Sequence, residues 1–147
     1  MKKIKIPFYQ SESEIPIIEV ALGNGTKTLA IVDSGSETTL IDKDFILENK
    51  NAFKVSKSRD MVSYTGLVSA QKMPAIVADT YVLPTGCKKY LPLHGYVFDM
   101  SYVSQSLLEA YNIDAKILIG SDTLNEYNAE LNYEKKELII KHDLSGK

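Results

Sequence analysis

The chain has 147 residues and 44% of them are hydrophobic, so it can bury a sizeable core and we expect one domain over residues 1–147. A formal net charge of -2 gives no electrostatic reason to bind nucleic acid or an anionic membrane. No stretch approaches the roughly 20 apolar residues of a membrane span and no signal peptide is recognisable, so we expect a cytoplasmic location.

Residues that carry metal or thiol chemistry are scarce. Cys87 is the only cysteine and the chain has two histidines, His94 and His142, so no internal disulfide, zinc site or catalytic cysteine is expected. Cys87 fits better as a small, partly buried residue beside a turn. We therefore expect no metal and no organic cofactor.

Short β-prone segments and tight turns dominate the first half of the chain. Residues 14–22 and 26–32 read as two strands, and the Gly-Asn-Gly sequence at 23–25 is a strong signal for the turn between them. Asp42 is predicted to cap a short helix over residues 43–48.

The second half continues in the same way. Its predicted elements are, in chain order, a hairpin over residues 61–73, a strand over 91–98, a helix over 104–111 capped by Ser104, a buried strand over 117–119, a short helix after Gly120 capped by Ser121 or Asp122, and a hairpin over 129–140. Many short strands, frequent turns and brief helices predict a mainly β barrel or sandwich. The regular strand–helix alternation of a Rossmann-like fold is missing.

An aspartate stands at the end of an apolar run. Residues 29–32 read Leu-Ala-Ile-Val, and Asp33-Ser34-Gly35-Ser36 follows. A carboxylate is costly to bury unless it is hydrogen bonded or shared; Ser34 offers a hydroxyl donor, and Gly35 allows a sharp turn that brings a backbone N–H to the carboxylate. An ordinary Asp-Ser-Gly β-turn is the alternative. Because the apolar runs on both sides look buried, we expect this turn to lie inside the fold.

A second apolar run, at 117–119, ends at Gly120. The segments LAIVDSGSETTLI and ILIGSDTLNEYNAELNYEKKELII, in this order, resemble the retropepsin-like aspartic proteases over roughly residues 15–140. The resemblance is closer to the retrotransposon and cellular versions, because Asp122 falls in a Gly-x-Asp-x-Leu pattern and Ser121 stands where retroviral enzymes usually have Arg. Ser34 stands where the family usually has Thr, so the hydroxyl is kept.

The resemblance implies a retropepsin-like closed barrel with one to three short helices, and peptide-bond hydrolysis by a water activated between two aspartates. The chain has one Asp-Ser-Gly, so a homodimer would have to supply the second Asp33. The apolar segments 4–6 and 138–140 are candidates for the dimer sheet. The residues implied beside Asp33 are Ser34, Gly35 and Ser36 as support, Tyr64, Thr65 and Gly66 as the tip of a flap over a peptide or protein substrate, and Ile119, Gly120 and Asp122 as the second motif.

Several alternatives stay open. The chain can be a non-catalytic peptide-binding or assembly module on the same fold, or a structural β domain of a larger polyprotein, because fold does not fix function. The proposed flap can be an ordinary hairpin with Tyr64 at the surface. Asp122 is expected to cap its helix or bind backbone N–H groups, not to perform chemistry. Glu37 fits either a substrate subsite or a solvated loop.

Overall fold

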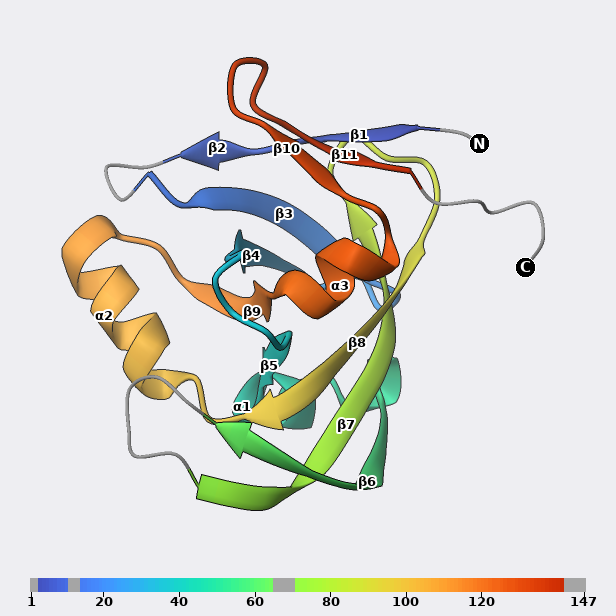
Figure 1. The fold of residues 1–147 in the computed structure, drawn as a ribbon, viewed down its shortest axis with the longest axis vertical. Helices are drawn as coiled ribbons and strands as arrows, with labels where there is room; N and C mark the ends of the chain where they lie inside the picture. Colours follow the sequence, from blue (N-terminus) through green and yellow to red (C-terminus); the bar gives the residue numbers. More distant parts are fainter. Residues whose placement is uncertain (1–2, 11–13, 65–70, 142–147) are drawn as a thin grey trace.

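The computed structural model describes residues 3–10, 14–64 and 71–141 (Figure 1). The strands are β1 (Ile4–Pro7), β2 (Tyr9–Gln10), β3 (Pro16–Leu22), β4 (Lys27–Val32), β5 (Leu40–Asp42), β6 (Lys54–Tyr64), β7 (Gln71–Pro84), β8 (Leu91–Phe98), β9 (Ala115–Ile119), β10 (Glu130–Asn132) and β11 (Glu137–Ile140). The helices are α1 (Lys43–Glu48), α2 (Ser101–Tyr111) and α3 (Ser121–Glu126), with a 3-10 turn, η1 (Lys50–Ala52).

The larger sheet closes on itself. Its strands pair in the order β3, β4, β9, β5, β8, β7, and β7 pairs back with β3, so six strands form a closed barrel. β2 and β6 continue the sheet beyond the barrel, next to β3 and β7. The prediction of a mainly β fold with a closed barrel and a few short helices is therefore confirmed.

β4 and β9, the parallel pair at the centre of this sheet, are buried on both faces. The main core takes alternate residues of both strands, which are Ala30, Val32, Ile117 and Ile119. Ile31 and Leu118 point to the opposite side and join a second cluster, against which Leu107 of α2 packs. Strands covered on both faces need no polar alternation. This double burial explains the apolar runs that end at Asp33 and at Gly120.

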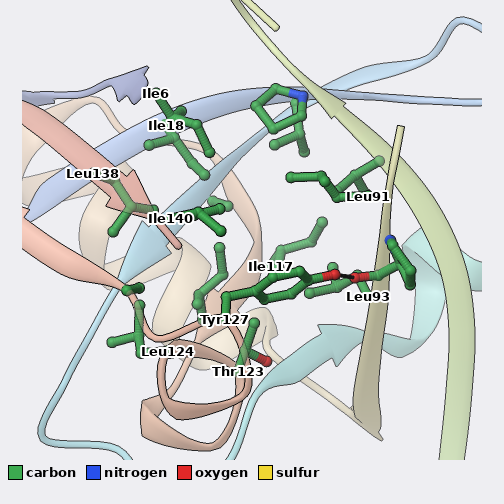
Figure 2. Close-up of a pocket in the computed structure, with 17 residues that line it drawn as sticks. Ile6, Ile18, Leu91, Leu93, Ile117, Thr123, Leu124, Tyr127, Leu138 and Ile140 are labelled. Carbon is green, nitrogen blue, oxygen red and sulfur yellow. Dashed lines mark hydrogen bonds between the residues drawn. The ribbon is translucent and has the colours of Figure 1, made fainter. Parts of the chain in front are cut away.

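The two ends of the chain meet in a second sheet, of order β1-β11-β10, at the top of Figure 1. Ile6, Leu138 and Ile140 are each at most 5% exposed and belong to the main core. They line a small apolar cavity of about 40 Å³ against barrel residues such as Leu91 (Figure 2). The apolar character of the terminal segments is thus explained by burial within their own chain.

One buried tyrosine ties α3 to the barrel beside this cavity. The Tyr127 hydroxyl donates a hydrogen bond to the carbonyl of Pro92, drawn as a dashed line in Figure 2. Burial raises the pKa of the Tyr127 hydroxyl above its ordinary value. The hydroxyl therefore stays protonated and serves as a donor.

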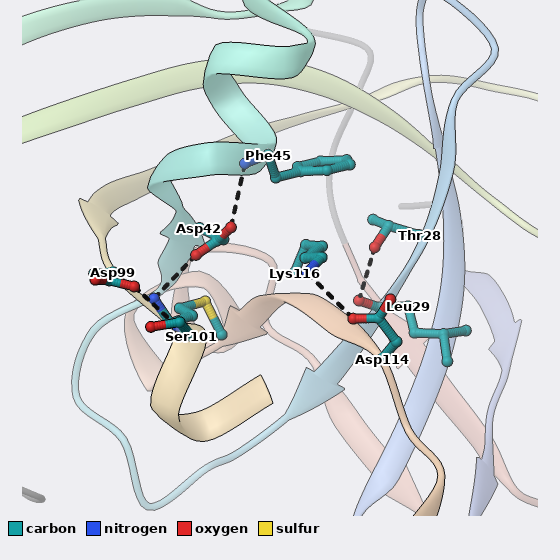
Figure 3. Close-up of polar contacts among 9 residues, drawn as sticks. Thr28, Leu29, Asp42, Phe45, Asp99, Ser101, Asp114 and Lys116 are labelled. Carbon is teal, nitrogen blue, oxygen red and sulfur yellow. Dashed lines mark hydrogen bonds and ion pairs between the residues drawn. The ribbon is translucent and has the colours of Figure 1, made fainter. Parts of the chain in front are cut away.

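Asp42 joins the starts of two helices. As predicted, it caps α1: Oδ2 accepts the N–H of Phe45 at 3.2 Å, while Oδ1 accepts the N–H of Met100 at 3.0 Å (Figure 3). The prediction that Ser104 caps a helix over 104–111 is wrong, because α2 already begins at Ser101. Asp42 and Asp99 accept the N–H groups of Met100 and Ser101, so the helix starts there without a serine cap.

Candidate active site

The segment from Asp33 to Thr39 crosses the end of a neighbouring strand. In the sheet β9 lies between β4 and β5, parallel to the first and antiparallel to the second. The loop that joins β4 to β5 must therefore pass over the carboxyl end of β9. Its first residue is fixed there, because Asp33 donates its backbone N–H to the carbonyl of Ile119 at 2.9 Å.

The carboxylate of Asp33 is held by its own turn. Gly35 donates its N–H to Oδ1 of Asp33 at 3.0 Å, and Ser36 donates its N–H to the carbonyl of Asp33 at 3.1 Å. A Cβ atom on Gly35 would lie 3.3 Å from Oδ1, which is tighter than ordinary contact. The expected approach of the Gly35 N–H to the carboxylate is confirmed.

The expectation that this turn lies inside the fold is wrong. Asp33, Ser34 and Gly35 are all exposed, although the strand that delivers them is buried. The reason is geometric: β4 ends at the rim of the barrel, and the loop bridges that rim before the chain becomes buried again at Thr39. Ser34 makes no side-chain hydrogen bond to any described residue. Glu37 is also exposed, so its two interpretations both remain.

Gly120 allows the loop to cross at very short range. A Cβ atom at this position would lie 2.4 Å from the carbonyl oxygen of Thr38 and 2.9 Å from that of Ser36. The next residue, Ser121, donates its N–H to the Ser36 carbonyl at 2.7 Å. Only glycine fits between β9 and this loop, which explains the glycine at the end of the second apolar run.

Thr39 is a member of the site that the sequence did not single out. Its side chain is fully buried, and its hydroxyl lies 3.0 Å from the N–H of Gly120, 2.7 Å from Oδ1 of Asp122 and 2.6 Å from the hydroxyl of Thr123. The one available signal was a threonine directly before the apolar Leu40. A buried hydroxyl needs partners, and the sequence did not show which ones.

Asp122 binds Thr39 and does not cap α3. Its Oδ2 accepts the backbone N–H of Thr39 at 3.1 Å, and its Oδ1 accepts the N–H of Thr123 at 2.8 Å. The expected binding of backbone N–H groups is confirmed, whereas the expected cap at Ser121 or Asp122 is wrong. The N-cap position of α3 is Gly120, which has no side chain to bond with.

The hairpin expected to carry the flap has two long described arms. β6 and β7 pair antiparallel, with a register that reaches Tyr64 opposite Gln71. Tyr64 is the last residue of β6. Thr65 and Gly66 lie outside the described residues, so the predicted flap tip stays a prediction.

The terminal strands have fewer free edges for pairing with a second copy than the sequence suggested. β11 pairs with β1 along one edge and with β10 along the other, so it has no edge left for a strand of a second copy. Within the part of the chain that the structure describes, β1 and β10 each keep one unpaired edge. β11 thus offers no free edge to a second copy in this structure, and a dimer sheet through the terminal strands stays a prediction.

The other reactive side chains that the structure describes lie apart from this site. Cys87 is partly buried, which raises the pKa of its thiol. Asp79 of β7 and His94 of β8 are paired across the sheet, and Oδ1 of Asp79 accepts a hydrogen bond from Nδ1 of His94 at 2.6 Å. The described residues contain no group of three metal-ligating side chains. Among the same residues, no helix is long and apolar enough to cross a membrane.

Comparisons with known proteins show the fold. No family model and no curated protein sequence matches the chain. A solved structure of a retropepsin-like aspartic protease from Rickettsia conorii is similar over 95% of this chain and 89% of its own, with 16% identity and a TM-score of 0.52. The retroviral protease-like domain of Ddi1 from Leishmania major is similar over 88% and 90%, with 18% identity and a TM-score of 0.54. The chain thus has the retropepsin-like fold.

Proposed function

We propose that this protein is an aspartic endopeptidase that works as a homodimer, with Asp33 of each copy at a shared two-fold axis. The placement of Asp33 carries the proposal: its carboxylate is exposed on a loop that hydrogen bonds fix to the end of a strand buried on both faces. A simple surface turn needs no such anchoring. The retropepsin-like fold supports the same function.

The chemistry follows from two carboxylates at close range. They cannot both ionise cheaply, so the pair holds one proton at mildly acidic pH. The ionised member takes a proton from a water molecule, which attacks the peptide carbonyl, and the protonated member donates to the carbonyl oxygen. This reaction needs neither a metal nor an organic cofactor.

The second carboxylate must come from a second copy, since the chain has one Asp-Ser-Gly segment. In a two-fold assembly the same patch of both copies meets, so the exposed Asp33, Ser34 and Gly35 would face their own counterparts. The β6–β7 hairpin would cover a bound peptide or protein, with Tyr64, Thr65 and Gly66 at its tip. We further propose that the enzyme acts in the cytoplasm.

The test is a subunit-mixing experiment with Asp33→Asn. Asn keeps the shape of Asp but can neither ionise nor act as an acid, so the variant should fold and lose hydrolysis of a mixed fluorogenic peptide library. Mixed with wild type, it should lower activity as about the square of the wild-type fraction, because a hybrid dimer has one carboxylate. Asp44→Asn, which removes an exposed acid on α1, is the matched control, and mixing it with wild type at constant total protein should leave activity unchanged at every ratio.

The alternative is a non-catalytic peptide-binding or assembly module, and the occupied edges of β11 favour it, because they close one route to a dimer. The same proteins decide between the two. A wild-type chain that binds library peptides but cleaves none of them at any pH from mildly acidic to neutral would establish the module. A linear decline with Asp33→Asn would refute the shared pair.

A further inference from the structure

The loop that carries Asp33 is fixed at both of its ends to one short segment, residues 119–123. At its start, the N–H of Asp33 binds the carbonyl of Ile119. At its other end, Thr39 binds Gly120 and Asp122. Between these ends the carbonyl of Ser36 accepts the N–H of Ser121. The position of the Asp33 carboxylate is therefore set by how well this one segment holds the loop.

The hydroxyl of Thr39 has its full set of hydrogen-bond partners. A hydroxyl donates one hydrogen and accepts two. Thr39 donates its hydroxyl hydrogen to Oδ1 of Asp122 at 2.7 Å. The hydroxyl then accepts from the N–H of Gly120 at 3.0 Å and from the hydroxyl of Thr123 at 2.6 Å. Each of its three bonds crosses from the Asp33 loop to residues 120–123.

Asp122 holds the same threonine by two of its groups. Oδ1 accepts the Thr39 hydroxyl and Oδ2 accepts the Thr39 backbone N–H at 3.1 Å. Asn in this place would present an NH₂ group to one of these two donors, so one bond would be lost. Both acceptor oxygens are needed, which explains an acid at a position that performs no proton transfer.

We propose that Thr39 and Asp122 are a pair of positioning residues that sets the placement of Asp33 at the two-fold axis. The effect on catalysis rests on the proposed peptidase function, while the effect on the loop does not. Neither residue lies on the exposed turn, and Thr39 is fully buried. They act on Asp33 through the backbone of the loop and not by contact with substrate.

The first measurement is amide hydrogen exchange at Asp33, Gly35 and Ser36, whose N–H groups are all bonded within the loop or to Ile119. Thr39→Val keeps the shape of the side chain and removes its hydroxyl, so exchange at these amides should be about tenfold faster or more, while amides of β3 and β4 keep their rates. Asp122→Asn should act in the same direction. Thr39→Ser, which keeps the hydroxyl, should restore most of the protection.

Thr80→Val is the matched control. Thr80 is also buried, at 5% exposure, and its hydroxyl donates to the carbonyl of Ala52 at 2.6 Å, away from the Asp33 loop. The Thr80→Val variant loses one buried hydrogen bond, so it reproduces a general loss of stability while the contacts of the Asp33 loop stay unchanged. Unchanged exchange at the three loop amides in Thr39→Val, or an equal change in Thr80→Val, would overturn the proposal even in a protein without peptidase activity.

The second measurement is the pH dependence of kcat. A displaced Asp33 should lower kcat about 10- to 100-fold with little change in KM, because small misplacements of a reacting group are costly. The two limbs of the pH profile should also move closer together in Thr39→Val, since two carboxylates held further apart repel less. The double variant with Asp122→Asn should be no worse than the more damaged single variant. A uniform loss at every pH, matched by Thr80→Val, would refute positioning.

Discussion

Gly120→Ala is the sharpest test of how the two motifs pack. Gly120 has φ near -96° and ψ near -177°, a backbone conformation that alanine also adopts, so the substitution causes no backbone strain. The substitution is unfavourable for steric reasons, because the new Cβ would lie 2.4 Å from the Thr38 carbonyl oxygen and 2.9 Å from that of Ser36. Both are backbone atoms, which cannot rotate away as a side chain can.

The expected loss can be worked out from these contacts. A carbon and a carbonyl oxygen normally approach to about 3.3 Å or more, so the loop must withdraw from β9 by about 1 Å. Overpacking of this kind costs about 1–3 kcal/mol. The bonds from Ser121 to Ser36 and from Gly120 to Thr39 would lengthen, each worth about 1 kcal/mol. The total of about 3–5 kcal/mol is a large share of the roughly 5–15 kcal/mol typical of whole domains.

Thermal unfolding followed by circular dichroism measures this change. For a chain of this size each kcal/mol shifts Tm by about 2–4 °C, so Gly120→Ala should melt roughly 6–20 °C lower than wild type. Gly23→Ala is the matched control, since a Cβ there meets nothing within 4 Å, and its stability should change by less than about 1 kcal/mol. A Gly120→Ala protein that melts within 2 °C of the control, about 1 kcal/mol or less, would refute the close crossing.

Three further predictions concern groups away from Asp33. Asp42→Ala should lower the free energy of unfolding by about 2–4 kcal/mol, because the N–H groups at two helix starts lose their buried acceptor, whereas Asp99→Ala, at an exposed site, should have a much smaller effect in the same urea titration. Tyr127→Phe should cost about 1 kcal/mol at pH 7 through the lost bond to Pro92, and less at high pH. The sign follows from the raised pKa of Tyr127: the folded state holds the proton more tightly, so wild type loses stability as pH rises above the ordinary tyrosine pKa of about 10 and Phe does not. Cys87 should react with a disulfide reagent at pH 8 more slowly than a free thiol such as glutathione, since burial raises its pKa, and denaturation should remove the difference.

Short-range signals in the sequence predicted most of the local elements and singled out Asp33 as a candidate. Apolar runs, the Gly-Asn-Gly turn and the Asp42 cap are short-range features, and each was found where its residues predicted it. Such signals need only neighbours in the chain, so one sequence carries them. The residues alone predicted a mainly β barrel or sandwich, and the resemblance of two segments to the retropepsin-like aspartic proteases indicated which one.

Tertiary structure decided which groups meet. The bonds from Thr39 to Asp122 join residues 83 positions apart, and no periodicity of the sequence predicts such a pair. α2 begins at Ser101 and not at the predicted Ser104, because Asp42, far away in sequence, accepts the N–H of Met100.

Exposure is likewise a property of the whole fold. We expected the Asp33 turn inside the fold because both flanking strands are apolar. Those strands bury both faces of the sheet, but their ends lie at the exposed rim of the barrel. The apolar terminal segments similarly suggested a dimer sheet, and in the structure they cover their own barrel. Hydrophobicity predicts that a residue is buried, but which residues cover it depends on how the whole chain packs.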